Sequence, residues 1–320
     1  MQDSRAEHRS QASVNMALPG HFYLISLVTL LAAVLTWFIW SAPVLPRSIW
    51  LGGGWVFGVV FYFGALRYPD LYWRTLERWY HELGSPRYFY RLSGLWLPWL
   101  VAIAVVLCLT GLVWGLAFAP PHHEQGNSYR IIYLHVPASS AALMGYMAMG
   151  VAGLVALVWR LKMAEIMIKA IAPFGAVMAA VSLISGAIWG RPTWGTYWIW
   201  DARLTSMLIL LFLYLGVIAL QNAIRDPRQA GRAASLLSVV GVINVVIVRY
   251  SVDWWQSLHQ GSSMSMFGTA GSAIHPSMLA PLLLSMFGIY FLYAVTVLVR
   301  ARTEILWRER KSQWVREEVS

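Results

Sequence analysis

Residues 95–119 read LWLPWLVAIAVVLCLTGLVWGLAFA, a run of 25 residues without a charged side chain. An apolar run longer than about 18 residues is typical of a helix that crosses a lipid bilayer. The whole chain shares this character, because 58% of its 320 residues are hydrophobic and only 12% are charged. A soluble domain carries about 25% charged residues. The sequence therefore predicts a polytopic integral membrane protein and excludes an ordinary soluble enzyme.

Seven further apolar blocks resemble this one. In lipid every backbone polar group must be satisfied within its own segment, so each block is predicted to be a helix and the fold class all-α. The eight predicted spans are 21–42, 50–66, 95–119, 138–159, 171–189, 204–222, 236–250 and 278–299. The first two form a hairpin within residues 1–71, for which the sequence suggests no function. The other six form a helix bundle within residues 72–320, the predicted functional domain.

The basic residues indicate how the chain is oriented. Lys and Arg number 24 against 14 Asp and Glu, which gives a formal net charge of +10. Such a balance would suggest a nucleic-acid partner in a soluble protein. Here the basic residues lie in alternate loops, so the positive-inside rule explains them and we expect no nucleic acid as a partner. Both termini are predicted to be cytoplasmic. The opposite loops are rich in Trp, His, Gly and Pro, and the functional chemistry is expected there.

One outer loop contains a dense aromatic cluster. Trp194, Trp198 and Trp200 lie within seven residues and are followed by Asp201 and Arg203. Trp residues also anchor helix ends at the membrane interface, and this belt is the alternative interpretation. A flat aromatic surface beside Arg suits a large planar ligand with charged edges, because aromatic faces stack on π systems and guanidinium groups bind carboxylates. A porphyrin with two propionates fits this description.

Histidine is concentrated in the same outer loops. His135 precedes the span 138–159, and His259 follows the span 236–250, so both are predicted near one surface. Two imidazoles can occupy both axial positions of a haem iron. The alternative is that each is an interfacial polar residue at a helix end. His122, His123 and His275 are weaker candidates, and spacing alone does not decide which histidines bind.

Three segments together resemble a known family. Residues 194–201, WGTYWIWD, are similar to the tryptophan-rich WWD signature of haem-handling proteins. With 127–138, NSYRIIYLHVPA, and 250–261, YSVDWWQSLHQG, the chain resembles the CcmC family, the haem exporter protein C of system I cytochrome c maturation. The resemblance runs from about residue 72 to the C-terminal tail, and the first 70 or so residues depart from the family pattern.

The resemblance implies a function and a setting. Members of the family bind haem at the periplasmic face of the bacterial inner membrane and deliver it to the haem chaperone CcmE. They act beside the ATPase CcmA, the membrane subunit CcmB and the small protein CcmD. Such a chain is a haem-transfer component with no catalytic residues of its own, and its cargo is non-covalent haem b.

The resemblance also implies a set of site residues. It makes His135 and His259 the axial ligands. It places the contact surface on Trp194, Trp198, Trp200 and Asp201. Chemistry adds Arg130 and Arg203, because they flank His135 and the Trp cluster where haem propionates could reach. The alternative is that these arginines pair with Asp201 or with phospholipid headgroups.

Two other functions remain open at this stage. The first is a haem lyase, or cytochrome c synthase, of the same superfamily, whose members usually carry a further His pair, with one His placed within the membrane. The second is a haem permease subunit of an ABC-type complex, which should have polar or broken helices near mid-membrane. The mild candidates for such positions are Pro173, Ser182, Ser185, Asn244 and Pro281.

Overall fold

The computed structural model describes residues 82, 84–255, 257–259 and 274–319. In these residues there are helices and no strands, so the predicted all-α fold class is confirmed. Six of their helices are long and apolar enough to cross a membrane, as the six-helix core requires. The two predicted N-terminal spans and the boundary at residue 71 lie outside the described residues.

The bundle is built from seven α-helices in the described part of the chain. They are α5 Pro86–Val113, α6 Ile132–Trp159, α7 Lys162–Trp194, α8 Ala202–Ala223, α9 Pro227–Trp254, α10 Pro276–Arg308 and α11 Gln313–Val319. A π-helical turn, Trp114–Phe118, extends α5, and a 3-10 turn, Asn127–Ile131, leads into α6. Local sequence sets several starts. The side chains of Ser85, Asp201 and Asp226 each accept a backbone hydrogen bond from the first turn that follows them.

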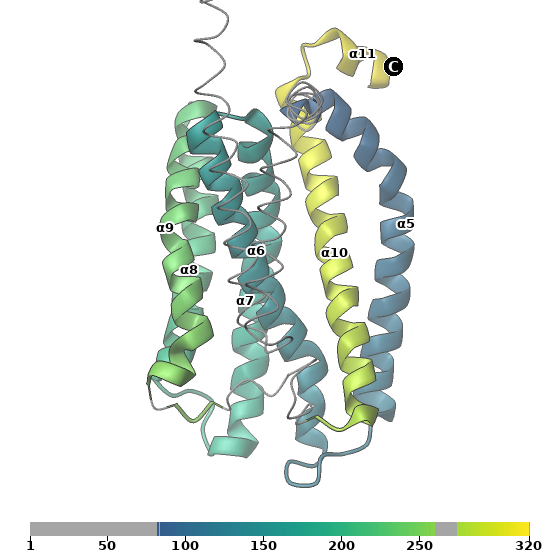
Figure 1. Cartoon of the computed structure of the whole chain (residues 1–320), viewed down its shortest axis with the longest axis vertical. Helices are drawn as coiled ribbons and strands as arrows, with labels where there is room; N and C mark the ends of the chain where they lie inside the picture. Colours follow the sequence, from purple (N-terminus) through teal and green to yellow (C-terminus); the bar gives the residue numbers. More distant parts are fainter. Residues whose placement is uncertain (1–81, 83, 256, 260–273, 320) are drawn as a thin grey trace, which may run out of the picture. The chain divides into compact units, whose positions relative to one another are not determined.

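The helices pack as one group of four with a pair beside it. α6, α7, α8 and α9 contact one another, while α5 packs mainly on α10, which also contacts α6 and α7 (Figure 1). Small residues permit the close approach of α5 and α10. A Cβ atom added to Gly111 would lie 2.4 Å from the backbone nitrogen of Ser285, and one added to Gly288 would lie 2.6 Å from that of Cys108. Such contacts are typical of helix pairs in membranes.

Several helices are longer than the predicted spans, and this changes the position of two site residues. His135 was expected in a loop before the span 138–159, but it lies in the first turn of α6. Trp194 was expected in a loop after the span 171–189, but it is the last residue of α7. The prediction was wrong on both points because each helix continues across a proline that had suggested a boundary. α6 begins before Pro137, at Ile132, and α7 runs on through Arg191 and Pro192.

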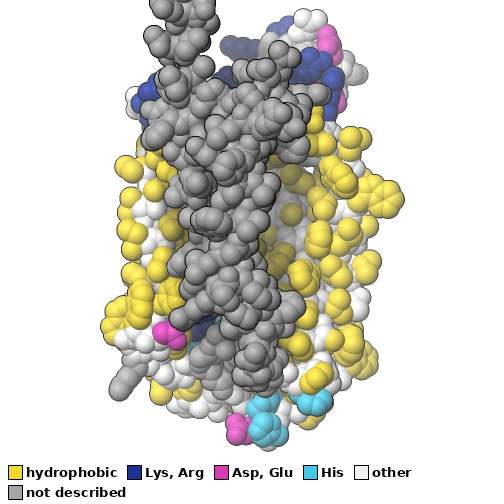
Figure 2. Space-filling model, viewed as in Figure 1, with side chains coloured by type: hydrophobic (Ala, Val, Ile, Leu, Met, Phe, Trp, Pro, Cys, Tyr) yellow, Lys and Arg dark blue, Asp and Glu magenta, His cyan; other side chains and the backbone are white. Residues whose placement is uncertain are grey.

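The two ends of the bundle differ in chemistry. At the end near α11, a short link joins α6 to α7 and another joins α8 to α9. The connections from α5 to α6 and from α7 to α8 lie at the other end, where α9 also ends and α10 begins (Figure 1). Figure 2 shows that Lys and Arg side chains on the visible face gather near α11, while the visible histidines lie at the opposite end. We call this opposite end the histidine end.

Candidate functional site

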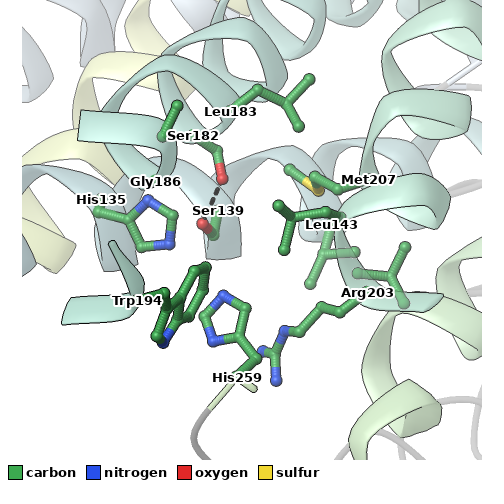
Figure 3. Close-up of a pocket in the computed structure, with 13 residues that line it drawn as sticks. His135, Ser139, Leu143, Ser182, Leu183, Gly186, Trp194, Arg203, Met207 and His259 are labelled. Carbon is green, nitrogen blue, oxygen red and sulfur yellow. Dashed lines mark hydrogen bonds between the residues drawn. The ribbon is translucent and has the colours of Figure 1, made fainter. Parts of the chain in front are cut away.

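A pocket at the histidine end brings together residues from four helices and the segment after α9. His135 of α6, Trp194 of α7, Arg203 of α8 and His259 line it, together with smaller apolar and hydroxyl side chains (Figure 3). Its enclosed volume is only about 60 Å³. Pockets that enclose a small molecule have volumes of about 300–1,000 Å³. A ligand larger than a few water molecules must therefore extend out of the mouth of the pocket.

The two histidines face each other across this pocket. The centroids of the His135 and His259 rings are 6.3 Å apart, and the ring planes are inclined by 27°. Figure 3 shows one nitrogen of each ring directed toward the other ring. A His nitrogen binds a metal ion at about 2.0–2.1 Å and lies about 1.1 Å from its ring centroid, so a metal held between two imidazoles separates their centroids by about 6.3 Å. The observed centroid separation would therefore suit a metal ion held by one nitrogen of each ring.

His135 is held on the inner side of the pocket by α7. Its ring is 9% exposed, and its Nδ1 lies 3.0 Å from the hydroxyl oxygen of Ser185. Beside it, a Cβ atom on Gly186 would lie 2.9 Å from Cε1 of the ring. The edge of Trp189 packs against the ring with a centroid separation of 5.7 Å. In the sequence, Ser185 and its neighbour Ser182 read only as mild polar interruptions of a span.

His259 is held on the outer side by the start of α8. One oxygen of Asp201 accepts a hydrogen bond of 2.7 Å from the backbone N–H of Leu204, and the other accepts one from the Ser257 hydroxyl. The Ser257 oxygen in turn accepts the backbone N–H of His259 at 3.0 Å. Asp201 does not line the pocket. Asp201 therefore positions the segment that carries His259.

The environment of His259 keeps its imidazole neutral. Burial, together with the nearby positive charge of Arg203 and the His135 ring, lowers the pKa of His259 to about 4, although Asp201 opposes the shift. A neutral imidazole has a nitrogen lone pair with which it can bind a metal. Of the described residues that line the pocket, Arg203 alone carries a permanent charge. The pocket therefore combines two nitrogen donors with a single cation.

The three tryptophans of the WWD segment have different positions. Trp194 lines the pocket, and its ring packs edge-on against His259 at 5.4 Å. The chain turns immediately after it at Gly195, which has a φ of 78°. Trp198 and Trp200 pack against each other at 5.4 Å but do not line the pocket, and Trp200 is 77% exposed. Within the described residues, the buried indole nitrogen of Trp198 has no hydrogen-bond partner.

Arg130 does not reach the pocket. Its guanidinium donates hydrogen bonds to the carbonyl oxygens of Leu116, at 3.2 Å, and Ala119, at 2.6 Å. These bonds link the end of the π-helical turn to the 3-10 turn that leads into α6. Contact between Arg130 and a ligand therefore stays a prediction.

The remaining outer histidines lie apart from the pocket. His122 stacks on Tyr129 with a centroid separation of 4.3 Å, and its Nδ1 accepts the backbone N–H of Glu124. The ligand atoms of His122, His123 and Glu124 lie within 4.8 Å of one another. His275 caps α10, because its Nδ1 accepts the backbone N–H of Ser277. None of these side chains lines the pocket.

Comparison with known proteins gives a consistent family assignment. A family model described as CcmC, Heme exporter protein C, matches residues 79–316. Heme exporter protein C of Escherichia coli K12 is 48% identical over 245 residues, which are 77% of this chain and 96% of that protein. The Haemophilus influenzae protein of the same name is 44% identical over 75% of this chain and 96% of its own length. The Bradyrhizobium diazoefficiens protein is 43% identical over 72% and 87%, respectively.

Proposed function

The chain belongs to the heme exporter protein C family, and from this premise we propose that it holds haem between His135 and His259 and delivers it to a partner. Membership makes it a multi-pass membrane protein that handles haem in cytochrome c maturation. The proposal adds the ligands, the cargo and its destination. The cargo is haem b, bound without a covalent link.

The observation that carries the proposal is the opposition of the two imidazoles. A centroid separation of 6.3 Å supports one axial bond from each ring to a single iron. Because the two residues come from α6 and from the segment after α9, the haem would join the two sides of the pocket. Trp194 packs against the His259 ring and provides an aromatic wall for the macrocycle.

Arg203 is suited to bind a haem propionate. It lines the same pocket as both histidines and is the charged group there among the described residues. A guanidinium binds a carboxylate through two parallel hydrogen bonds, and a partly desolvated site strengthens such bonds. Arg203 of α8 would then hold a propionate and help to orient the haem.

The exposed aromatic residues of the WWD segment support delivery rather than permanent storage, because a partner must be able to reach one edge of the haem while the histidines hold the iron. Trp198 and Trp200 follow the pocket residue Trp194 closely in the sequence. Their rings pack against each other, and Trp200 is largely exposed. We propose that this pair supports the exposed part of the haem until transfer.

The resemblance to the family supports a setting and a set of partners. We place the end near α11 in the cytoplasm and the histidine end in the periplasm of a bacterial inner membrane, because cytoplasmic ends carry the excess of Lys and Arg. The receiving partner is the haem chaperone CcmE, and the chain acts beside the ATPase CcmA, the membrane subunit CcmB and CcmD. The chain itself is a transfer component without catalytic residues. Within the described helices His135 is the only histidine, which favours this function over that of a haem lyase with a second His pair.

Haem transfer in cells tests the proposal. The chain is co-expressed with CcmE in cells that lack their own copy, and the chaperone–haem adduct is detected by haem staining after electrophoresis. His259→Ala should abolish the adduct, whereas His123→Ala, which changes an exposed histidine outside the pocket, should not. Normal adduct levels in both His135→Ala and His259→Ala, with normal membrane insertion, would refute the proposal.

A further inference from the structure

We propose that Ser185 is a positioning residue that fixes the tautomer of His135, so that Nε2 is the nitrogen presented to the iron. The inference rests on the proposed function, because it concerns how one of the two ligands is prepared. It assigns a role to a serine of α7 that does not itself line the pocket but lies behind His135, which does.

The position of one proton carries the argument. The Ser185 hydroxyl oxygen lies 2.6 Å from the carbonyl oxygen of Val181 and 3.0 Å from Nδ1 of His135. A hydroxyl has a single proton to donate, and a carbonyl oxygen can only accept. The shorter contact therefore takes the Ser185 proton, since two acceptor oxygens at 2.6 Å would otherwise repel each other.

This assignment also determines which nitrogen of His135 carries the ring proton. Once the Ser185 proton is donated to Val181, its oxygen can only accept from Nδ1. Nδ1 must then carry the ring proton, and the lone pair of the neutral ring lies on Nε2. A metal-binding imidazole requires this arrangement, in which one nitrogen donates to a neighbouring acceptor and the other binds the metal.

The surroundings hold the pair in place. Ser185 is 4% exposed and His135 is 9% exposed, so little water can replace the hydrogen bond. Gly186, the next residue of α7, leaves room for the ring, because a Cβ there would lie 2.9 Å from Cε1. The edge of Trp189 packs against the ring as well. α7 therefore contributes three residues to the surroundings of the His135 ring. Ser185 accepts a hydrogen bond, Gly186 leaves room for the ring, and Trp189 packs against it.

The hydrogen bond should alter the haem as well as the protein. A bond from Nδ1–H to an acceptor makes the imidazole more basic and a stronger donor to iron. A stronger donor favours the oxidised iron, so it lowers the reduction potential of the haem. Removal of the acceptor should raise this potential and also weaken haem binding, since loss of such a partner typically costs about 10–100-fold in metal affinity.

The full-length protein, purified in detergent and titrated with haemin, provides the test. Ser185→Ala should bind haemin at least about tenfold more weakly and shift the midpoint potential upward, and Ser185→Thr, which keeps the hydroxyl, should restore both. Ser238→Ala is the matched control. Ser238 is also a buried serine that donates to the carbonyl four residues earlier, Ala234, but it lies outside the pocket. It should change neither quantity.

The outcomes separate this inference from the proposed function. Unchanged affinity and potential in Ser185→Ala would overturn the inference, and so would an equal shift in Ser238→Ala, which would indicate a general packing effect. If Ser185→Ala is not recovered from membranes, Ser185→Cys, a weaker acceptor, should give a smaller shift in the same direction. A bis-imidazole spectrum that survives in His135→Ala would instead refute the proposed function itself.

Discussion

Gly186 offers a direct test of how closely α7 fits the ring of His135. A Cβ atom in Gly186→Ala would lie 2.9 Å from Cε1 of that ring, whereas carbon atoms pack at about 3.5–4.0 Å. The ring must therefore move by about 0.6–1.1 Å or the helices must separate. Overpacking of this kind costs about 1–3 kcal/mol. If the whole cost falls on the ligand-bearing ring, haem affinity should fall by roughly fivefold to 150-fold.

Haemin titration of the purified variant, followed at the Soret band, measures this loss. Ala favours a helix over Gly by about 1 kcal/mol, so α7 itself should not be weakened by the change. Gly216→Ala is the matched control, because its Cβ would contact only the end of the Leu237 side chain, at 3.1 Å, away from the pocket. Equal haem affinity in the two variants would show that the His135 ring is not confined by α7, and the site geometry would have to be revised.

Three further changes address the other sides of the site. Ser257→Ala removes the link between Asp201 and the backbone N–H of His259. Haemin titration should show binding weakened by about tenfold, as expected for the loss of one hydrogen bond to a charged group. Unchanged binding would mean that this link does not position His259. Arg203→Ala should weaken haemin binding by about tenfold or more, and Arg203→Lys should weaken it less. Equal haemin affinity in the unchanged chain and both variants would exclude a propionate contact. The double variant Trp198→Ala and Trp200→Ala should insert normally but reduce the CcmE–haem adduct in haem-stained gels, and a normal adduct would make the pair an interfacial anchor only.

Much of the fold could be predicted from the apolar runs of the sequence. The six helices of membrane-spanning length follow from runs such as residues 95–119, because the bilayer requires helices of a minimum length and low charge. Their ends could not be predicted equally well. His135 and Trp194 lie inside helices, because α6 begins before Pro137 and α7 continues through Arg191 and Pro192, and in both helices the proline lies inside the helix rather than at its end.

The structure brings four of the predicted site residues together, and their contact with haem stays a prediction. His135, His259, Trp194 and Arg203 line one pocket, as their common position at the outer ends of spans suggested. Ser185 was not recognised as a partner of His135, because the faces of α6 and α7 that meet depend on packing between helices. A sequence signal did exist in the polar residues of the span 171–189, but it indicated a broken helix as readily as a hydrogen-bond acceptor.

Asp201 and Arg130 illustrate the same limit. Both are polar residues beside the haem-handling motifs, and the sequence placed both at the ligand. The structure gives each a partner in the protein: Asp201 binds the backbone of α8 and Ser257, and Arg130 binds the carbonyl oxygens of Leu116 and Ala119. Sequence position near a motif does not distinguish a ligand contact from a residue that supports one.

The absorbance spectrum of the purified protein with haemin tests the central claim most directly. The two-histidine site predicts a low-spin bis-imidazole spectrum for the unchanged chain, and its loss in both His135→Ala and His259→Ala. His122→Ala and His275→Ala, which change outer histidines that do not line the pocket, should keep the spectrum of the unchanged chain. A bis-imidazole spectrum that persists in either pocket variant and disappears in His122→Ala or His275→Ala would contradict the account.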